Sequence, residues 1–326
     1  MATWVETRSG VGRHFLGVRG LEREALAAVL GRAAQLKRAW LEGEPLPQAL
    51  AGRTVATLFF EPSTRTRNSF LQAAQLLGGL TLTVEAESSS VRKGETLEDT
   101  VRTLEAVGVE VMVLRHPESG AALRAAAAAS RLAVLNAGDG MHEHPSQALL
   151  DVMTLAEHFG GARRSGELDL DVLRGLRLLI LGDIAHSRVA RSDIWALTTL
   201  GARLWVSGPA TLLGWLPEEV RRVERPEEVL GQVDAVMALR LQRERMADGL
   251  VPSEREFRQR WGMTADRVRL LPAHAVVLHP APVNRNVELD DSVMDSDRSL
   301  VFQQARNGVA VRMALLERAV EGEDAR

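Results

Sequence analysis

Apolar positions along the chain follow two alternating patterns. Residues Leu21–Leu41 have apolar side chains at every third or fourth position, which is the period of an amphipathic helix. After this segment, short apolar runs alternate with polar stretches and with further segments of helical period. The runs predict strands over Thr54–Phe60, Leu80–Val84, Val109–Leu114, Leu132–Asn136, Leu176–Leu181, Arg203–Val206, Val233–Leu239 and Ala275–Leu278.

The alternation of strands and helices defines the expected architecture. Strands that are separated by helices pair in parallel and are joined by right-handed crossovers. We therefore predict an α/β fold with two open parallel-sheet α/β domains and the active site in the cleft between them. A helix over Pro145–Phe159 would bridge the two domains. The expected division is residues 1–144 and 145–303, with a last helix (Gly308–Glu321, within 304–326) packing back on the first domain.

Composition narrows the class of protein. The chain has 326 residues, 45% hydrophobic and 25% charged, which is enough for two domains with their own cores. Its net charge is -3, with 40 basic and 43 acidic residues intermixed, so a nucleic acid partner is not expected. No apolar run approaches the roughly 20 residues that span a bilayer. With no cysteine and no apolar signal segment, the chain is expected to be soluble and cytoplasmic.

Candidate chemistry follows the predicted strands. In open parallel sheets, ligands bind at the carboxyl ends of the strands. The segment after 132–136 contains His142 and His144. The segments after five other strands each contain an arginine: Arg65, Arg115, Arg188, Arg240 and Arg285. A cation-rich cleft is therefore expected where these strands end.

The stretch FFEPSTRTRNSF, residues 59–70, predicts a site for a tetrahedral oxyanion. Ser63 suits the cap of a helix, and Thr64, Arg65 and Thr66 add hydroxyl and guanidinium donors beside the helix N-terminus. The alternative is a solvated first turn, but arginines at this end oppose the helix dipole, which favours a bound phosphate. Neither the GxxxxGK[ST] nor the GxGxxG pattern is present, so a nucleotide cofactor is not predicted.

Two further segments carry polar groups. On residue types alone, ESSSVRKG (87–94) is interpreted as a solvated loop. In MHEHPSQALLD, Pro145 suits the first position of a helix, and Gln147 then lies in its first turn. His142 and His144 could both ligate a metal, but no third ligand follows at a recognisable spacing. We therefore predict that His144 is a hydrogen-bond donor and that there is no metal site.

Six motifs in this order resemble the aspartate carbamoyltransferase family over roughly residues 50–315. They are FFEPSTRTR, VRKGETLEDT, LRHP, NAGDGMHEHPSQALLD, RLQRERM and HPAPVNR. Ornithine carbamoyltransferases share the STRTR and HPxQ patterns, so these motifs indicate carbamoyl phosphate and leave the acceptor open. In place of the His-Cys-Leu-Pro motif of the ornithine enzymes, this chain has His279-Pro280-Ala281-Pro282. Arg188, Arg240 and Gln242 suit a dicarboxylate such as L-aspartate and would repel a cationic ornithine side chain.

The resemblance implies roles for individual residues. The phosphate of carbamoyl phosphate would be held by Ser63, Thr64, Arg65 and Thr66. The carbonyl oxygen would be polarised by Arg65, Thr66, Arg115 and His144. The carbamoyl amino group would be fixed by Gln147 and by the backbone of Ala281 and Pro282. L-aspartate would be bound by Arg188, Arg240, Gln242 and Lys93. Ser89 and Lys93 would reach the active site of the adjacent subunit. The resemblance thus replaces the interpretation of residues 87–94 as a solvated loop.

The resemblance also implies the reaction and the assembly. A transferase would move the carbamoyl group of carbamoyl phosphate to the amino group of L-aspartate, giving N-carbamoyl-L-aspartate and phosphate in pyrimidine biosynthesis, with no cofactor. A homotrimer with shared active sites is expected, with dihydroorotase or regulatory chains as potential partners in a larger assembly. The alternatives are a carbamoyltransferase for ornithine or another amine, and a non-catalytic anion-binding subunit of this fold. The latter would be expected to have damaged STRTR or HPxQ motifs, and both are intact.

Overall fold

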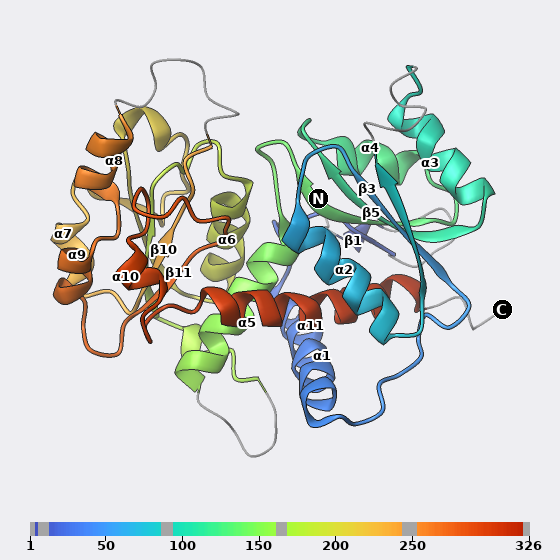
Figure 1. The fold of residues 1–326 in the computed structure, drawn as a ribbon, viewed down its shortest axis with the longest axis horizontal. Coiled ribbons are helices and arrows are strands. Elements are labelled where there is room, and N and C mark those ends of the chain that lie inside the picture. Colours follow the sequence, from blue (N-terminus) through green and yellow to red (C-terminus); the bar gives the residue numbers. More distant parts are fainter. Residues whose placement is uncertain (1–3, 6–12, 86–93, 161–167, 243–252, 322–326) are drawn as a thin grey trace.

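Two α/β units lie side by side in the structure, a computed structural model, and two long helices run between them (Figure 1). The structure describes residues 4–5, 13–85, 94–160, 168–242 and 253–321. The first sheet has the order β1-β2-β6-β5-β3-β4. Its strands are β1 (Trp4–Val5), β2 (His14–Phe15), β3 (Thr54–Phe59), β4 (Leu80–Glu85), β5 (Val109–His116) and β6 (Ala133–Asp139).

The second sheet has the order β11-β10-β7-β8-β9, and all of its strands pair in parallel. In the first sheet only β1 and β2 pair antiparallel. The strands of the second sheet are β7 (Arg177–Leu181), β8 (Arg203–Ser207), β9 (Arg221–Arg222), β10 (Ala235–Ala238) and β11 (Val276–Leu278). The predicted fold of two parallel-sheet α/β units is thus confirmed.

The helices cover both faces of the sheets, and the core follows them. They are α1 (Arg23–Glu42), α2 (Thr64–Leu76), α3 (Leu97–Ala106), α4 (Ala121–Ala128), α5 (Pro145–Gly160), α6 (Arg188–Thr199), α7 (Glu227–Leu230), α8 (Glu254–Trp261), α9 (Ala265–Leu270), α10 (Asp291–Met294) and α11 (Val301–Val320). One buried apolar cluster joins α1, α2, α5, α6 and α11 to the facing sides of both sheets. Smaller clusters fill the two outer layers, under α3 and α4 and under α8. The two units therefore share one continuous core.

All eight predicted strands are present, with ends shifted by up to three residues. The sequence pattern missed β1, β2 and β9, because two residues are too few to establish a period of two. Helix α5 begins at Pro145 as predicted, and its residues 145–156 are all buried, because it lies between the two units. None of the helices in the described ranges combines the length and the apolar content needed to cross a membrane.

The predicted start of the last helix, at Gly308, is wrong. Helix α11 begins at Val301, and Gly308 lies in its interior. A Cβ atom at Gly308 would stand 2.5 Å from Nη1 of Arg312 and 3.2 Å from Cδ2 of Leu150. The glycine therefore permits close packing of α11 against α5 and does not mark a helix end. Helix α11 also packs against α1 and α2 of the first unit.

Candidate active site

A cavity of about 1260 Å³ lies between the two units and is lined by residues from both. It brings together the predicted site residues that the structure describes: Ser63, Thr64, Arg65, Thr66, Arg115, His144, Gln147, Arg188, Arg240, Gln242, Ala281 and Pro282. Ser89 and Lys93 lie outside the described residues. The carboxyl ends of β3, β5 and β6 thus face segments that follow β7, β10 and β11.

The oxyanion side of the cavity is the start of α2. Helix α2 begins at Thr64, after Ser63 in the cap position. Contrary to the sequence prediction, the Ser63 side chain makes no capping hydrogen bond with the described part of the chain. The first N–H groups of a helix have no carbonyl partner within the helix. Together with the helix dipole, the hydroxyl of Ser63 and the side chain of Arg65, they form a site suited to an anion.

A buried arginine that sequence analysis missed lies behind this helix start. Arg312 of α11 is 4% exposed, and its Nη1 donates to Oγ of Ser69 at 2.6 Å. The Ser69 hydroxyl lies 2.7 Å from the carbonyl oxygen of Arg65, in the first turn of α2. Burial lowers the pKa of Arg312 to about 9, which leaves it cationic at neutral pH. An arginine in the otherwise apolar run VAVRMALL is the signal that could have identified it.

Glu61 connects the arginines of the two units and was also missed. It precedes α2, and its Oε2 accepts a hydrogen bond from Nε of Arg115 at 3.1 Å and one from Nη2 of Arg188. Arg188 is 3% exposed and begins α6 in the second unit. Its guanidinium lies against Gly138, where a Cβ atom would stand 2.9 Å from Nε of Arg188. One carboxylate therefore links the first unit to a buried arginine of the second.

The backbone of His144 is anchored to α6. Its N–H donates to Oγ of Ser192 at 2.9 Å, and that hydroxyl lies 3.0 Å from Oε2 of Glu143. The same Glu143 oxygen accepts the N–H of Val18 at 2.7 Å. Glu143 thus ties the segment after β2 to α6, which fixes the position of His144 at the start of α5.

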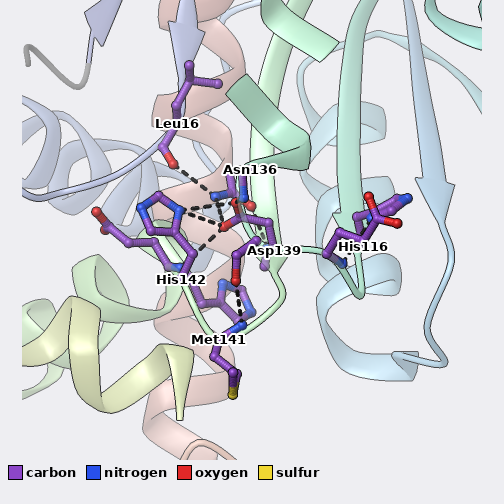
Figure 2. Close-up of polar contacts among 12 residues, drawn as sticks. Leu16, His116, Asn136, Asp139, Met141 and His142 are labelled. Atoms are coloured by element: carbon purple, nitrogen blue, oxygen red, sulfur yellow. Dashed lines mark hydrogen bonds and ion pairs between the residues drawn. The ribbon is translucent and has the colours of Figure 1, made fainter. Parts of the chain in front are cut away.

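Asp139 organises the turn before His144, and Figure 2 shows it between Asn136 and His142. The Asn136 side chain donates from Nδ2 to Asp139 at 2.8 Å and to the carbonyl oxygen of Leu16 at 2.9 Å. Nδ1 of His142 lies 3.1 Å from Asp139, and this hydrogen bond raises the pKa of His142. His144 instead lines the cavity. In the ranges that the structure describes, no cluster of three or more His, Asp or Glu residues could hold a metal ion.

The side of the cavity that faces the start of α2 is shaped by hydrogen bonds near the ends of strands in the second sheet. After β11, the N–H of Ala281 donates to Nδ1 of His279 at 2.7 Å. Burial lowers the pKa of His279, which keeps the ring neutral and able to accept. Ala281 has φ of 50° and precedes a cis peptide bond to Pro282. After β10, the backbone N–H of Gln242 donates to Asp183, at the end of β7. These bonds shape the two segments that face the start of α2.

Two carboxyl groups are buried behind Gln147. Nε2 of Gln147 donates to Oδ1 and Oδ2 of Asp151 at 3.1 and 3.2 Å. The carboxyl group of Asp193, on α6, interacts with that of Asp151, and both side chains are 0% exposed. Burial raises the pKa of Asp151 to about 7 and raises that of Asp193 well above its usual value. The pair therefore holds a proton at pH values where an ordinary aspartate is ionised.

The fold and the cavity define a class: a two-unit α/β protein with a cation-rich cleft suited to two anionic ligands. Residues 13–157 match the family model described as aspartate/ornithine carbamoyltransferase, carbamoyl-P binding domain. Residues 174–319 match the Asp/Orn binding domain of the same family. The chain belongs to the aspartate/ornithine carbamoyltransferase family, which confirms the resemblance seen in its motifs.

Curated relatives and solved structures resemble nearly the whole chain. The aspartate carbamoyltransferase catalytic subunit of Parafrankia sp. (strain EAN1pec) is 50% identical over 309 residues, which cover 93% of this chain and 95% of the relative. That of Xanthomonas campestris pv. campestris (strain B100) is 47% identical over 324 residues, covering 97% and 99%. Aspartate transcarbamoylase from Trypanosoma cruzi in complex with carbamoyl phosphate and aspartate has a TM-score of 0.82 at 30% identity, covering 97% and 99%.

The buried acid pair predicts how stability depends on pH. Above about pH 4 the unfolded chain releases a proton that the folded chain keeps on this buried pair, because burial raises the pKa of both carboxyl groups. Relative to Asp193→Asn, the free energy of unfolding should therefore fall as the pH rises from about 4 towards neutral, by about 1.4 kcal/mol per pH unit. Urea unfolding at several pH values measures this difference. Asp266→Asn, at an exposed position, is the control, and its free energy of unfolding should change with pH as that of the unmodified chain does. The same pH dependence in Asp193→Asn would contradict the shared proton.

Proposed function

We propose that this chain is the catalytic subunit of an aspartate carbamoyltransferase, a transferase that moves the carbamoyl group of carbamoyl phosphate to the amino group of L-aspartate. The observation that carries the proposal is the single cavity in which the anion-binding start of α2 faces Arg188, Arg240 and Gln242. The two curated relatives named above, at 50% and 47% identity, support this acceptor. So do the T. cruzi aspartate transcarbamoylase structures with carbamoyl phosphate and with aspartate.

The start of α2 would hold carbamoyl phosphate by its phosphate group. The helix N-terminus with Ser63, Thr64, Arg65 and Thr66 supplies hydrogen-bond donors and positive charge. Arg312 adds a buried cation behind the same turn. The leaving phosphate stays bound to these groups while the reaction proceeds.

Four groups would stabilise charge on the carbonyl oxygen. Arg65, Thr66, Arg115 and His144 line the cavity beside the phosphate site. Attack on the carbonyl carbon moves negative charge onto this oxygen, and a donor already aimed at it lowers the activation barrier by about 3 kcal/mol. On the other side of the carbonyl carbon, the amino group would be held by Gln147 and by the backbone of Ala281 and Pro282.

L-aspartate would bind between the units. Arg188 and Arg240 each match a carboxylate, Gln242 adds a hydrogen bond, and Lys93 of an adjacent subunit completes the site. In the bound state a substrate carboxylate would replace part of the contact that Glu61 makes with Arg188.

The reaction then needs alignment and charge stabilisation. The deprotonated α-amino group of aspartate attacks the carbonyl carbon, so that a C–N bond forms and the carbonyl π electrons move to oxygen. As the carbonyl re-forms, the C–O bond to phosphate breaks, and the departing phosphate accepts the amine proton. Holding both substrates together lowers the activation barrier by on the order of 7 kcal/mol or more. His144 acts as a hydrogen-bond donor throughout.

A homotrimer in the cytoplasm is part of the proposal. Ser89 and Lys93 follow the edge strand β4, whose Leu80 and Leu82 are 61% and 39% exposed. Apolar side chains on an uncovered edge strand suit burial against a second copy of the chain. That contact would carry the loop after β4 into the neighbouring active site.

Product analysis tests the proposed reaction. The protein is supplied with carbamoyl phosphate and, in parallel, with L-aspartate or L-ornithine. We expect N-carbamoyl-L-aspartate and no citrulline, because Arg188 and Arg240 attract a dicarboxylate and repel a cationic side chain. Citrulline would mean that the acceptor side is interpreted wrongly. The absence of both products would favour a non-catalytic subunit of this fold.

Two arginines that line the same cavity provide a matched pair of variants. Arg240→Ala should lower kcat/KM for L-aspartate by roughly 10- to 150-fold, since a hydrogen bond to a charged group contributes about 1.5–3 kcal/mol. Arg285→Ala should change it less than about twofold, because Arg285 is already engaged by Asp291 and Asp295, at 2.8 and 3.0 Å. Steady-state kinetics with aspartate as the varied substrate compares them. Equal effects would argue against Arg240 as an aspartate ligand.

Mixed trimers test the shared site. Lys93→Ala and Arg65→Ala chains should each be inactive alone, because every site lacks one group. After dissociation and random reassembly, roughly a quarter of the sites would combine an intact Arg65 with an intact Lys93 from the neighbour. Activity should recover to about that fraction of the unmodified level. No recovery, with mixed trimers confirmed by mass spectrometry, would mean that each subunit has a self-contained site.

A further inference from the structure

The orientation of the Gln147 amide is fixed from behind the cavity. Nε2 of Gln147 donates to both oxygens of Asp151, and a carboxylate can accept these bonds but cannot donate. The amide therefore presents its acceptor, Oε1, to the cavity that it lines. An acceptor at this position complements an NH2 group and has nothing to bond with on a methyl group.

The same carboxylate fixes a second amide. Nε2 of Gln304, on α11, donates to Oδ1 of Asp151 at 2.6 Å. Oε1 of Gln304 accepts the backbone N–H of His279 at 3.0 Å, at the start of the turn that contains Ala281 and Pro282. Asp151 thus lies behind both groups proposed to contact the carbamoyl amino group.

The carboxyl group of Asp193 also lies beside that of Asp151. It is 0% exposed, and no N–H or hydroxyl group of the residues that the structure describes donates to either of its oxygens. Two carboxyl groups form a hydrogen bond only when one carries a proton. Asp151 accepts from two amides and faces the cation Arg312, which favours its charged form, so the proton resides on Asp193. Asp193 then donates to Asp151 from α6.

We propose that Asp151 is a positioning residue that makes the site selective for a carbamoyl group over an acetyl group, and that protonated Asp193 holds Asp151 in place. The inference rests on the proposed function and names the basis of its donor specificity. Acetyl phosphate has the shape of carbamoyl phosphate with a methyl group in place of the NH2. Binding it would leave Oε1 of Gln147 buried without a donor, which is costly in a largely buried site.

The test applies one isosteric change to two adjacent acids. In Asp151→Asn, the new amide can face Gln147 with either its oxygen or its NH2, so Gln147 is free to turn over. In Asp193→Asn, the new NH2 donates to Asp151 in place of the proton. The measured quantity is selectivity, the dissociation constant of acetyl phosphate divided by that of carbamoyl phosphate, both determined by calorimetry. The dissociation constant of inorganic phosphate is measured alongside, because the phosphate site should be unchanged.

We expect selectivity to fall about tenfold in Asp151→Asn, equivalent to one lost hydrogen bond, and to stay within about twofold in Asp193→Asn. Asp193→Leu, which removes the donor and retains Asp151, should lower selectivity severalfold. Unchanged selectivity in Asp151→Asn would overturn the proposal. If that variant does not fold, unchanged selectivity in Asp193→Leu would overturn it instead. A wild-type protein that binds carbamoyl phosphate in preference to acetyl phosphate but forms no carbamoyl aspartate would overturn the proposed reaction and not this assignment.

Discussion

Positive charge gathered in a partly buried cleft is the constraint on which the rest of the structure depends. Six arginines line one cavity: Arg65, Arg115, Arg188, Arg240, Arg285 and Arg312. Removing like charges from water and placing them together is unfavourable unless carboxylates or bound anions compensate. Glu61 compensates Arg115 and Arg188, and Asp151 faces Arg312. In the proposed reaction the two substrates would bring further negative charge into this cavity, and a substrate carboxylate would replace part of the contact between Glu61 and Arg188.

Buried helices between the two sheets hold the groups of the cavity in place. Helix α5 is buried along most of its length, and it carries Gln147 and Asp151 on consecutive turns. Helix α6 approaches it with Ser192 and Asp193, which reach the backbone of His144 and the side chain of Asp151. Polar contacts at this junction are buried and directional, so they fix the positions of cavity groups more tightly than apolar packing alone.

Sequence patterns predicted the parts of this arrangement that are local. Arginines and histidines after strands could be located because parallel strands end on the same edge of a sheet, and Arg65 and Arg188 indeed line one cavity. Arg312 and the Asp151–Asp193 pair could not be found this way, and Glu61, although it follows β3, could not be recognised as the partner of Arg115 and Arg188. Their importance depends on contacts between segments far apart in the chain, such as Arg312 with Ser69. The prediction that the last helix begins at Gly308 was wrong for a related reason, because this glycine allows close packing against α5.

Binding of N-(phosphonacetyl)-L-aspartic acid, measured by calorimetry, tests most directly whether the cleft is one site for both anions. This compound joins a phosphonate to two carboxylates, and a T. cruzi aspartate transcarbamoylase structure contains it. We expect this compound to bind far more tightly than phosphate or L-aspartate alone, and Arg65→Ala and Arg240→Ala each to weaken its binding at least about tenfold. An affinity no greater than that of either small anion would contradict a single cleft that holds both.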